Sequence, residues 1–219
     1  ATGCNNGEGF NSPTTKNNLP NAFRPIEIRS GDWPWWRGPT HDGIAEKQSV
    51  PQHWNEEKNI LWKTAVPGKG HASPIVVEDR IFLTTADHET NTISLLCYDR
   101  ESGNLLWEKE IHRGPFMHMH KKNSQASATP AWDGKFVFVV FMIEDGIYVT
   151  ALNHDGNIVW QTRAGDFDSK HGYGSSPFLY KSLLIVNGDN QGTGFLAALD
   201  RNTGKIIWRV NRKNNSSFA

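Results

Sequence analysis

The stretch ALDRNTGKIIW, residues 198–208, decides the fold, because its pattern recurs along the chain. It places a small residue, an Asp, a Thr-Gly turn and a Trp at fixed offsets. CYDRESGNLLW, residues 97–107, has the same length, with Cys for Ala and Ser for Thr. ALNHDGNIVW, residues 151–160, is one residue shorter, and NILW, residues 59–62, carries only the last part. A recurring pattern of this kind indicates a fold built from repeated units.

The spacing of the repeat favours β-structure. Its Trp residues, at 62, 107, 160 and 208, are 45, 53 and 48 residues apart. Periods of about 40 to 50 residues with several strands per unit are typical of β-propellers. The apolar residues between these Trps form short or alternating runs broken by turn signals, and they lack the period of a helix.

Each unit contains four such runs, which predict four strands. The expected strands are 73–77, 80–85, 93–98 and 105–110 in the first unit, 128–132, 135–141, 147–152 and 158–162 in the second, and 175–180, 183–187, 194–199 and 206–211 in the third. Asp-Gly pairs favour tight hairpins, and they occur at 133–134, 145–146 and 155–156. A proline lies near the start of each unit's first strand, where it removes no ladder hydrogen bond, at Pro74, Pro130 and Pro177.

The arrangement resembles the PQQ-like (quinoprotein) propeller repeat family, whose docking motif is Ala-x-Asp-x-x-Thr-Gly-x-x-x-Trp. The resemblance covers residues 59–219 and implies an all-β propeller of four-stranded antiparallel blades. It also implies that each Trp lies on the outermost strand of a blade and stacks on the small residue and Gly between neighbouring blades, a structural role. The implied docking residues are Trp62, Cys97, Asp99, Gly103, Trp107, Ala151, Gly156, Trp160, Ala198, Asp200, Thr203, Gly204 and Trp208.

The chain is too short for a closed propeller of this kind. Residues 59–219 suffice for about three blades, whereas propellers have four to eight. We therefore expect part of a ring of seven or eight blades, in which residues 59–66 form an outermost strand without inner strands before it. Residues 32–58 are a Trp-rich segment, in which Trp33, Trp35 and Trp36 are expected to cap the hydrophobic side of the propeller, with a ligand-stacking platform as the alternative.

Composition excludes several classes of partner. Lys plus Arg and Asp plus Glu both number 23, so no global field favours nucleic acid. No apolar run approaches the length of a membrane span. Residues 1–31 read as a disordered tether, and Cys4 at its start, after small residues, is a candidate lipidation site that would be the only membrane attachment. Cys97 fills the small-residue position of the repeat and is expected to be buried.

Candidate ligand or partner groups come from the loops that precede each first strand, residues 68–74, 122–130 and 171–177. These loops should converge at one mouth of the central channel. The polar and aromatic groups expected there are His71, Asn123, His171 and Tyr173, with a mere channel lining as the alternative.

No metal site is predicted. His112, His118 and His120 could in principle bind Zn or Cu, but their loop has no acidic residue to orient an imidazole, so solvated histidines are favoured. DRNTG, residues 200–204, begins like a calcium loop, yet its twelfth position is Asn211 instead of Glu. Asp200 is instead expected to accept backbone N–H bonds within its turn.

Two functions follow from the resemblance. The first is a non-catalytic scaffold in the bacterial periplasm or cell envelope that binds other envelope proteins, as PQQ-like propellers of the outer-membrane assembly machinery do. This reading implies no cofactor. The alternative is a PQQ-dependent quinoprotein oxidoreductase, with PQQ and calcium at the channel mouth. The vicinal Cys-Cys pair found in many such dehydrogenases is absent, since the cysteines are at 4 and 97.

Overall fold

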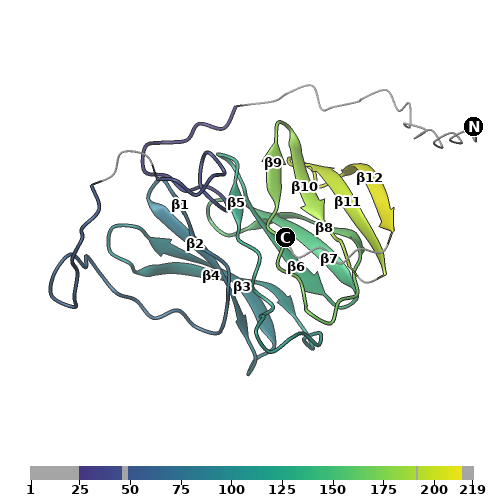
Figure 1. The fold of residues 1–219 in the computed structure, drawn as a ribbon, viewed down its shortest axis with the longest axis horizontal. Helices are drawn as coiled ribbons and strands as arrows, with labels where there is room; N and C mark the ends of the chain where they lie inside the picture. Colours follow the sequence, from purple (N-terminus) through teal and green to yellow (C-terminus); the bar gives the residue numbers. More distant parts are fainter. Residues whose placement is uncertain (1–24, 46–48, 191, 214–219) are drawn as a thin grey trace, which may run out of the picture.

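The computed structural model describes residues 25–45, 49–190 and 192–213, and the regular structure of these residues is β-strand. Twelve strands form three antiparallel four-stranded sheets, which we call blades 1, 2 and 3. Blade 1 contains β1 (Ile75–Val77), β2 (Arg80–Asp87), β3 (Thr92–Asp99) and β4 (Leu105–Arg113); blade 2 contains β5 (Ala131–Trp132), β6 (Val137–Ile143), β7 (Gly146–Leu152) and β8 (Ile158–Asp166); blade 3 contains β9 (Phe178–Tyr180), β10 (Leu183–Asn187), β11 (Thr193–Asp200) and β12 (Ile206–Lys213). The blades follow one another in chain order, from blue through green to yellow (Figure 1). The predicted all-β fold of four-stranded units is confirmed.

The first strand of each blade begins later than predicted. We expected these strands to include a proline, but each begins at the residue after it, at Ile75, Ala131 and Phe178. Proline has no N–H to donate, so the ladder starts with the next residue.

Blade 2 lies between the other two blades, and this position explains why the sequence of β6 is apolar throughout. Val137, Val139 and Phe141 belong to the core between blades 1 and 2. Phe138, Val140 and Met142 belong to the core between blades 2 and 3. Successive side chains of a strand point to opposite faces, so a strand packed on both sides needs an unbroken apolar run. The outermost strand of the same blade, β8, is instead mostly exposed or half-buried.

The Trp rings dock between blades as predicted. Each ring lies over a glycine in the turn between the third and fourth strands of the following blade, and a Cβ added to this glycine would lie 2.4 to 3.0 Å from the nearest ring atom. The pairs are Trp62 with Gly103, Trp107 with Gly156, and Trp160 with Gly204. The small residues Cys97, Ala151 and Ala198 are fully buried, and each pairs across the sheet with the Trp of its own blade. The repeat motif is therefore a packing motif.

The Asp of the motif orders the turn, also as predicted. The Oδ1 atom of Asp200 accepts hydrogen bonds from the backbone N–H of Asn202 (2.8 Å) and of Thr203 (2.9 Å). In blade 1, Asp99 Oδ1 accepts from the backbone N–H and hydroxyl of Ser102, both at 2.7 Å. These bonds stabilise the turn that presents the docking glycine.

The strand expected at residues 59–66 is not formed. Among the described residues this segment has no ladder partner, and Leu61 is 94% exposed. Its contact with blade 1 is made through Trp62, whose ring covers Gly103 and whose Nε1 donates to the carbonyl oxygen of Arg100 at 3.1 Å. A docking ring can thus be seated without its strand, because the ring packs on a turn and not on a ladder.

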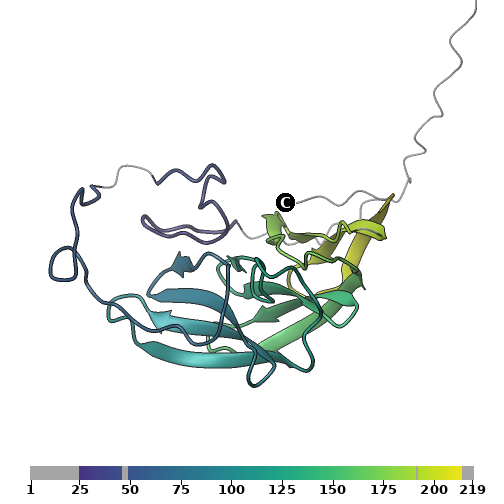
Figure 2. The same ribbon diagram turned by 60° about the horizontal axis from the view of Figure 1, so that its bottom comes forward.

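The Trp-rich segment lies along the inner strands of the blades. Trp33 forms an antiparallel bridge with Val76 of β1, and the carbonyl oxygen of Pro34 accepts from the N–H of Trp132 in β5 at 2.9 Å. His41 stacks on Trp35 (ring centroids 5.0 Å apart) and also contacts the ring of Phe178 in β9, at 4.9 Å. Figure 2 shows this purple segment beside the edge of the blue sheet. Residues 32–41 therefore contact the inner edges of all three blades, and Trp35 is buried while Trp36 is 51% exposed.

Two points concern membrane attachment. Among the described residues, no helix is long and apolar enough to cross a membrane. Cys4 and most of the predicted tether, residues 1–24, lie outside the described residues.

The expected burial of Cys97 is confirmed, and burial raises the pKa of its thiol to about 12.

Candidate functional site

The loops that precede the inner strands meet, as predicted, at one end of the blades. The backbone N–H groups of His71 and Ala72 donate to the carbonyl oxygen of Ala126, at 2.9 and 3.1 Å. The N–H of Thr129 in turn donates to Ser176 Oγ at 3.0 Å. Each loop is therefore hydrogen-bonded to the loop of the next blade.

A side-chain network extends across the same three loops. The Nδ1 atom of His71 is 2.9 Å from Ser124 Oγ, and Ser124 Oγ is 3.1 Å from Ser127 Oγ. Asn123 accepts a hydrogen bond from Ser127 through Oδ1 and donates through Nδ2 to the carbonyl oxygen of His171, at 2.7 Å. Three of the four residues expected at the channel mouth are thus joined by one network.

Tyr173 has a different role. Its ring is 5% exposed, belongs to the core between blades 2 and 3, and meets the ring of Phe167 edge-on at 5.4 Å. Burial raises the pKa of its hydroxyl, which has no hydrogen-bond partner among the described residues. The expectation that Tyr173 lines the mouth beside the other three groups is therefore corrected: its ring is part of the core, because it packs on Phe167 and other apolar side chains between blades 2 and 3.

Three members of this site were missed from the sequence. Ser124 and Ser127 connect the loops, and His120 lies with its ring centroid 5.9 Å from that of His171. The two serines in NSQAS were a weak signal, because serines are common in loops. His120 was considered only as a metal ligand.

The network can bind a polar partner, but it is not built for nucleophilic catalysis. Ser124 bonds to an imidazole, yet it is only 1% exposed, so its hydroxyl is not accessible to a substrate. His71, His120 and His171 are exposed and can exchange hydrogen bonds with a partner at the surface.

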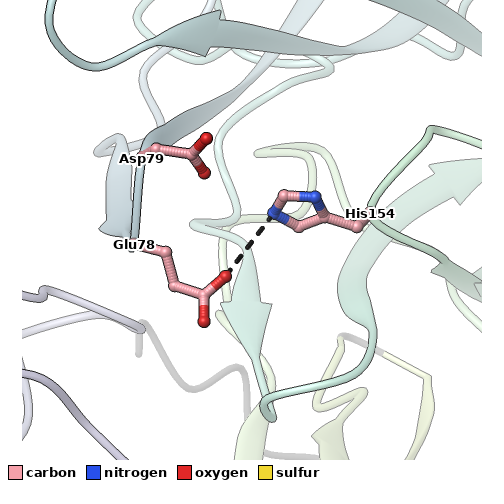
Figure 3. Close-up of side chains that lie close together, drawn as sticks. All are labelled: Glu78, Asp79 and His154. Carbon is pink, nitrogen blue, oxygen red and sulfur yellow. Dashed lines mark ion pairs between the residues drawn. The ribbon is translucent and has the colours of Figure 1, made fainter.

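The histidine triple considered as a metal site is not assembled. Among the described residues, the group of His, Cys, Asp and Glu that comes close enough to hold an ion consists of Glu78, Asp79 and His154 (Figure 3). Glu78 and Asp79 lie in the turn between β1 and β2, and His154 lies in the turn between β7 and β8. His112, His118 and His120 do not form such a group.

The Glu78–Asp79–His154 group is already engaged with basic side chains. Glu78 Oε1 is 3.0 Å from Arg29 Nη2, and Asp79 Oδ1 is 3.7 Å from Arg80 Nε. Glu78 Oε2 lies 3.9 Å from His154 Nε2. Arginine cannot lose its proton in proteins, so the carboxylates face fixed positive charges that compete with a metal ion.

Among the described residues, the network at the inner-strand loops does not have the donor groups of a PQQ–calcium site. Calcium prefers carboxylate and carbonyl oxygens in groups of six to eight. The network at the inner-strand loops instead brings together imidazole, hydroxyl and amide groups. The carboxylates of Glu78 and Asp79 belong to the opposite end of the strands, where arginines face them.

Exposed apolar side chains gather in the part of the chain that precedes β1. Among the described residues, eight of the seventeen large apolar side chains that are exposed lie within residues 28–66. They are Ile28, Trp36, Ile44, Val50, Trp54, Ile60, Leu61 and Val66. Exposed apolar surface of this kind marks sites of interaction with other proteins, ligand-binding grooves or surfaces prone to aggregation.

Comparison with known proteins agrees with the propeller fold. The family model described as outer membrane protein assembly factor BamB matches residues 52–141 and again 91–218. Among solved structures, a europium-containing methanol dehydrogenase is 19% identical, with a TM-score of 0.53 over 70% of this chain and 27% of that one. A quinohemoprotein alcohol dehydrogenase from Comamonas testosteroni is 18% identical, with a TM-score of 0.49 over 66% of this chain and 21% of that one. No curated protein matches. The chain thus spans about a quarter of the length of these two enzymes, and the first shares its fold.

Proposed function

The chain belongs to the PQQ-like propeller family described as outer membrane protein assembly factor BamB, and we propose that it is a non-catalytic scaffold that binds other proteins of the bacterial cell envelope. The repeat motif is used for packing between blades, and the polar network at the inner-strand loops has no accessible nucleophile. Both features favour binding over chemistry.

The exposed apolar surface before β1 carries the proposal. Trp54 is 66% exposed and Leu61 is 94% exposed, although both residue types are usually buried. Aromatic side chains are enriched at the centres of protein interfaces, where they bury a large area at low entropic cost. We therefore assign the contact with partner proteins to residues 50–66, with the imidazoles of the inner-strand loops as a second, polar contact.

Photo-crosslinking in cells tests this assignment. A photoreactive amino acid is placed at position 54 or 61 of the full protein, and at Glu101, an exposed turn residue of blade 1, as the control. We expect discrete adducts with envelope proteins from positions 54 and 61 and none from 101. Equal labelling at all three positions, or none, would overturn the proposal.

We further propose that the chain binds no PQQ. Titration with PQQ and Ca²⁺, followed by Trp fluorescence, is expected to show no saturable quenching. Saturation in the micromolar range that a chelator abolishes would instead support the quinoprotein oxidoreductase.

Cys4 is the proposed lipid anchor, on the basis of the small residues before it and the polar segment after it. Metabolic labelling with a fatty acid analogue should mark the protein in bacteria and should be lost in Cys4→Ser. Labelling that persists in Cys4→Ser would place the modification elsewhere, and no labelling of either protein would remove it.

A further inference from the structure

The residue that follows the turn Asp or Asn of the repeat occupies the same place in all three blades. It is Arg100 in DRESG, His154 in NHDG and Arg201 in DRNTG. The docking of the Trp rings uses the glycines of these turns and the backbone carbonyl oxygens of Arg100 and Arg201, but not the side chains of these two residues. Each of the three side chains instead lies beside an acidic residue from the part of the chain that precedes its own blade.

The contact is closest between blades 3 and 2. Arg201 Nε lies 3.2 Å from Oδ2 of Asp133, in the turn between β5 and β6, and both side chains are about 95% buried. The other oxygen, Oδ1, accepts the backbone N–H bonds of Lys135 (3.0 Å) and Phe136 (2.8 Å). The turn therefore fixes the carboxylate so that its free oxygen faces the next blade.

The same contact joins blades 2 and 1 with a weaker base. His154 Nε2 lies 3.9 Å from Glu78 Oε2, in the turn between β1 and β2, as Figure 3 shows. The ring of His154 also meets the ring of Phe82 edge-on, with the centroids 6.0 Å apart. This packing holds the imidazole between the two blades.

For blade 1, the Trp-rich segment supplies the acid. Arg100 Nη1 lies 3.6 Å from Oδ1 of Asp32, and Arg100 Nη2 donates to the carbonyl oxygen of Gly31 at 3.1 Å. The carboxylate of Asp32 is 1% exposed and accepts backbone N–H bonds from Arg29 and Glu78, as Asp133 does from its own turn. Asp32 thus takes the place that Asp133 takes for blade 3.

We propose that these contacts are charge pairs that determine which unit packs on which. The base after the turn Asx of each blade pairs with an acid in the first turn of the blade before it or, for blade 1, with Asp32 of the Trp-rich segment. All three pairs have the same polarity. A buried charge without its partner is costly, so a pair of this kind selects its neighbour even where it adds little net stability. In the first turn of blade 3, Lys181 has the same φ of 54° as Glu78 in the first turn of blade 1, but its charge is the opposite one. The first turns of these two blades are therefore not interchangeable as partners of a base.

The buried pair provides the first test, by chemical denaturation of Arg201→Met, Asp133→Asn and the double variant in the full chain. Asn at 133 retains an Oδ1 acceptor for the turn. We expect each single change to lower the folding equilibrium constant about a hundredfold or more, and the double variant to recover at least tenfold of this loss. Additive losses would overturn the proposal.

The half-exposed pair provides a second test, in which the variant still folds. His154→Arg introduces the residue found in the other two turns and should raise the folding constant about two- to fivefold. The gain should vanish in a Glu78→Gln background, and His53→Arg, on an exposed segment, should have no effect in either background. An equal gain from His154→Arg with and without Glu78 would show that the pair has no role. Stabilisation of the wild type by Zn²⁺, lost in His154→Gln, would identify a metal site instead and would also overturn the proposal.

Discussion

Substitution of Gly204 by alanine tests whether the Trp rings hold the blades together. Gly204 has a φ of +72°, and a Cβ there would lie 2.5 Å from Cε3 of Trp160 and 2.7 Å from Oγ1 of Thr162. Ordinary contact requires about 3.5 Å or more, so the ring would have to move by about 1 Å. Trp160 also donates to the carbonyl oxygen of Arg201 at 3.2 Å, and Thr162 to that of Gly204 at 2.9 Å.

Three costs combine in this variant. A positive φ costs a residue with a Cβ about 1–2 kcal/mol. Overpacking against a buried ring costs about 1–3 kcal/mol, and each weakened hydrogen bond about 1 kcal/mol. We therefore expect Gly204→Ala to lower the free energy of unfolding by about 4–7 kcal/mol.

Gly134→Ala is the matched control. Gly134 has a φ of +90°, but no atom lies within 4 Å of an added Cβ, so this variant should lose only the conformational cost of about 1–2 kcal/mol. Urea denaturation followed by Trp fluorescence and far-UV circular dichroism measures both. Equal losses for the two variants would refute the reasoning, because Trp160 would then not be packed on Gly204. In a Trp160→Ala background, the cost of Gly204→Ala should fall toward that of the control, and only the contact with Thr162 should remain.

Three further predictions concern single residues. Tyr173→Phe should leave the free energy of unfolding unchanged or raise it, because the buried hydroxyl of Tyr173 has no hydrogen-bond partner among the described residues. Tyr173→Ala should lower the free energy of unfolding by about 3–5 kcal/mol, because it removes a buried ring. A clearly lower melting temperature for Tyr173→Phe would reveal a partner for the hydroxyl. In a Cys4→Ser background, Cys97 should resist iodoacetamide at pH 8 and react after unfolding in urea, because burial raises the pKa of its thiol to about 12. As the pH rises above about 8.5, the unfolded state loses its thiol proton before the folded state does, so the free energy of unfolding should fall. Leu61→Ser should change the free energy of unfolding by less than about 0.5 kcal/mol, because the side chain of Leu61 is 94% exposed. The neighbouring Trp62→Ala should lower it by several kcal/mol, because the ring of Trp62 packs on Gly103. Equal effects of the two changes on the melting temperature would contradict this packing.

The repeat unit was legible in the sequence because its causes are local. A tight turn needs an Asx acceptor and a glycine with positive φ, so Asp200 and Gly204 stand at a fixed spacing. The ring that packs on such a glycine must be large and flat, so each repeat also carries a Trp, as Trp160 does for Gly204. The unbroken apolar run of β6 is likewise a local signal, and the structure shows that its cause is burial on both faces. Element type and blade number could be predicted for these reasons.

The candidate site was only half predictable. That the loops before the inner strands meet follows from the propeller topology, and His71, Asn123 and His171 were found in this way. Whether a side chain in such a loop points outward or into the core depends on the path of the backbone, and here sequence reasoning misplaced Tyr173.

By itself, the sequence determined the fold, the repeat and its docking rings, because hydrophobic period, turn chemistry and a recurring Trp act over a few residues. Only the tertiary structure decided which charged side chains of different units meet, and where the Trp-rich segment packs on the blades. The pairs Arg201–Asp133 and Arg100–Asp32 join residues 68 positions apart in the chain, and no local pattern links their members. The place of Trp35 and His41 against Phe178, at the inner edges of the blades, has the same origin. Such contacts depend on where the backbone brings distant charges and rings in three dimensions, and that geometry exists only once the blades have packed.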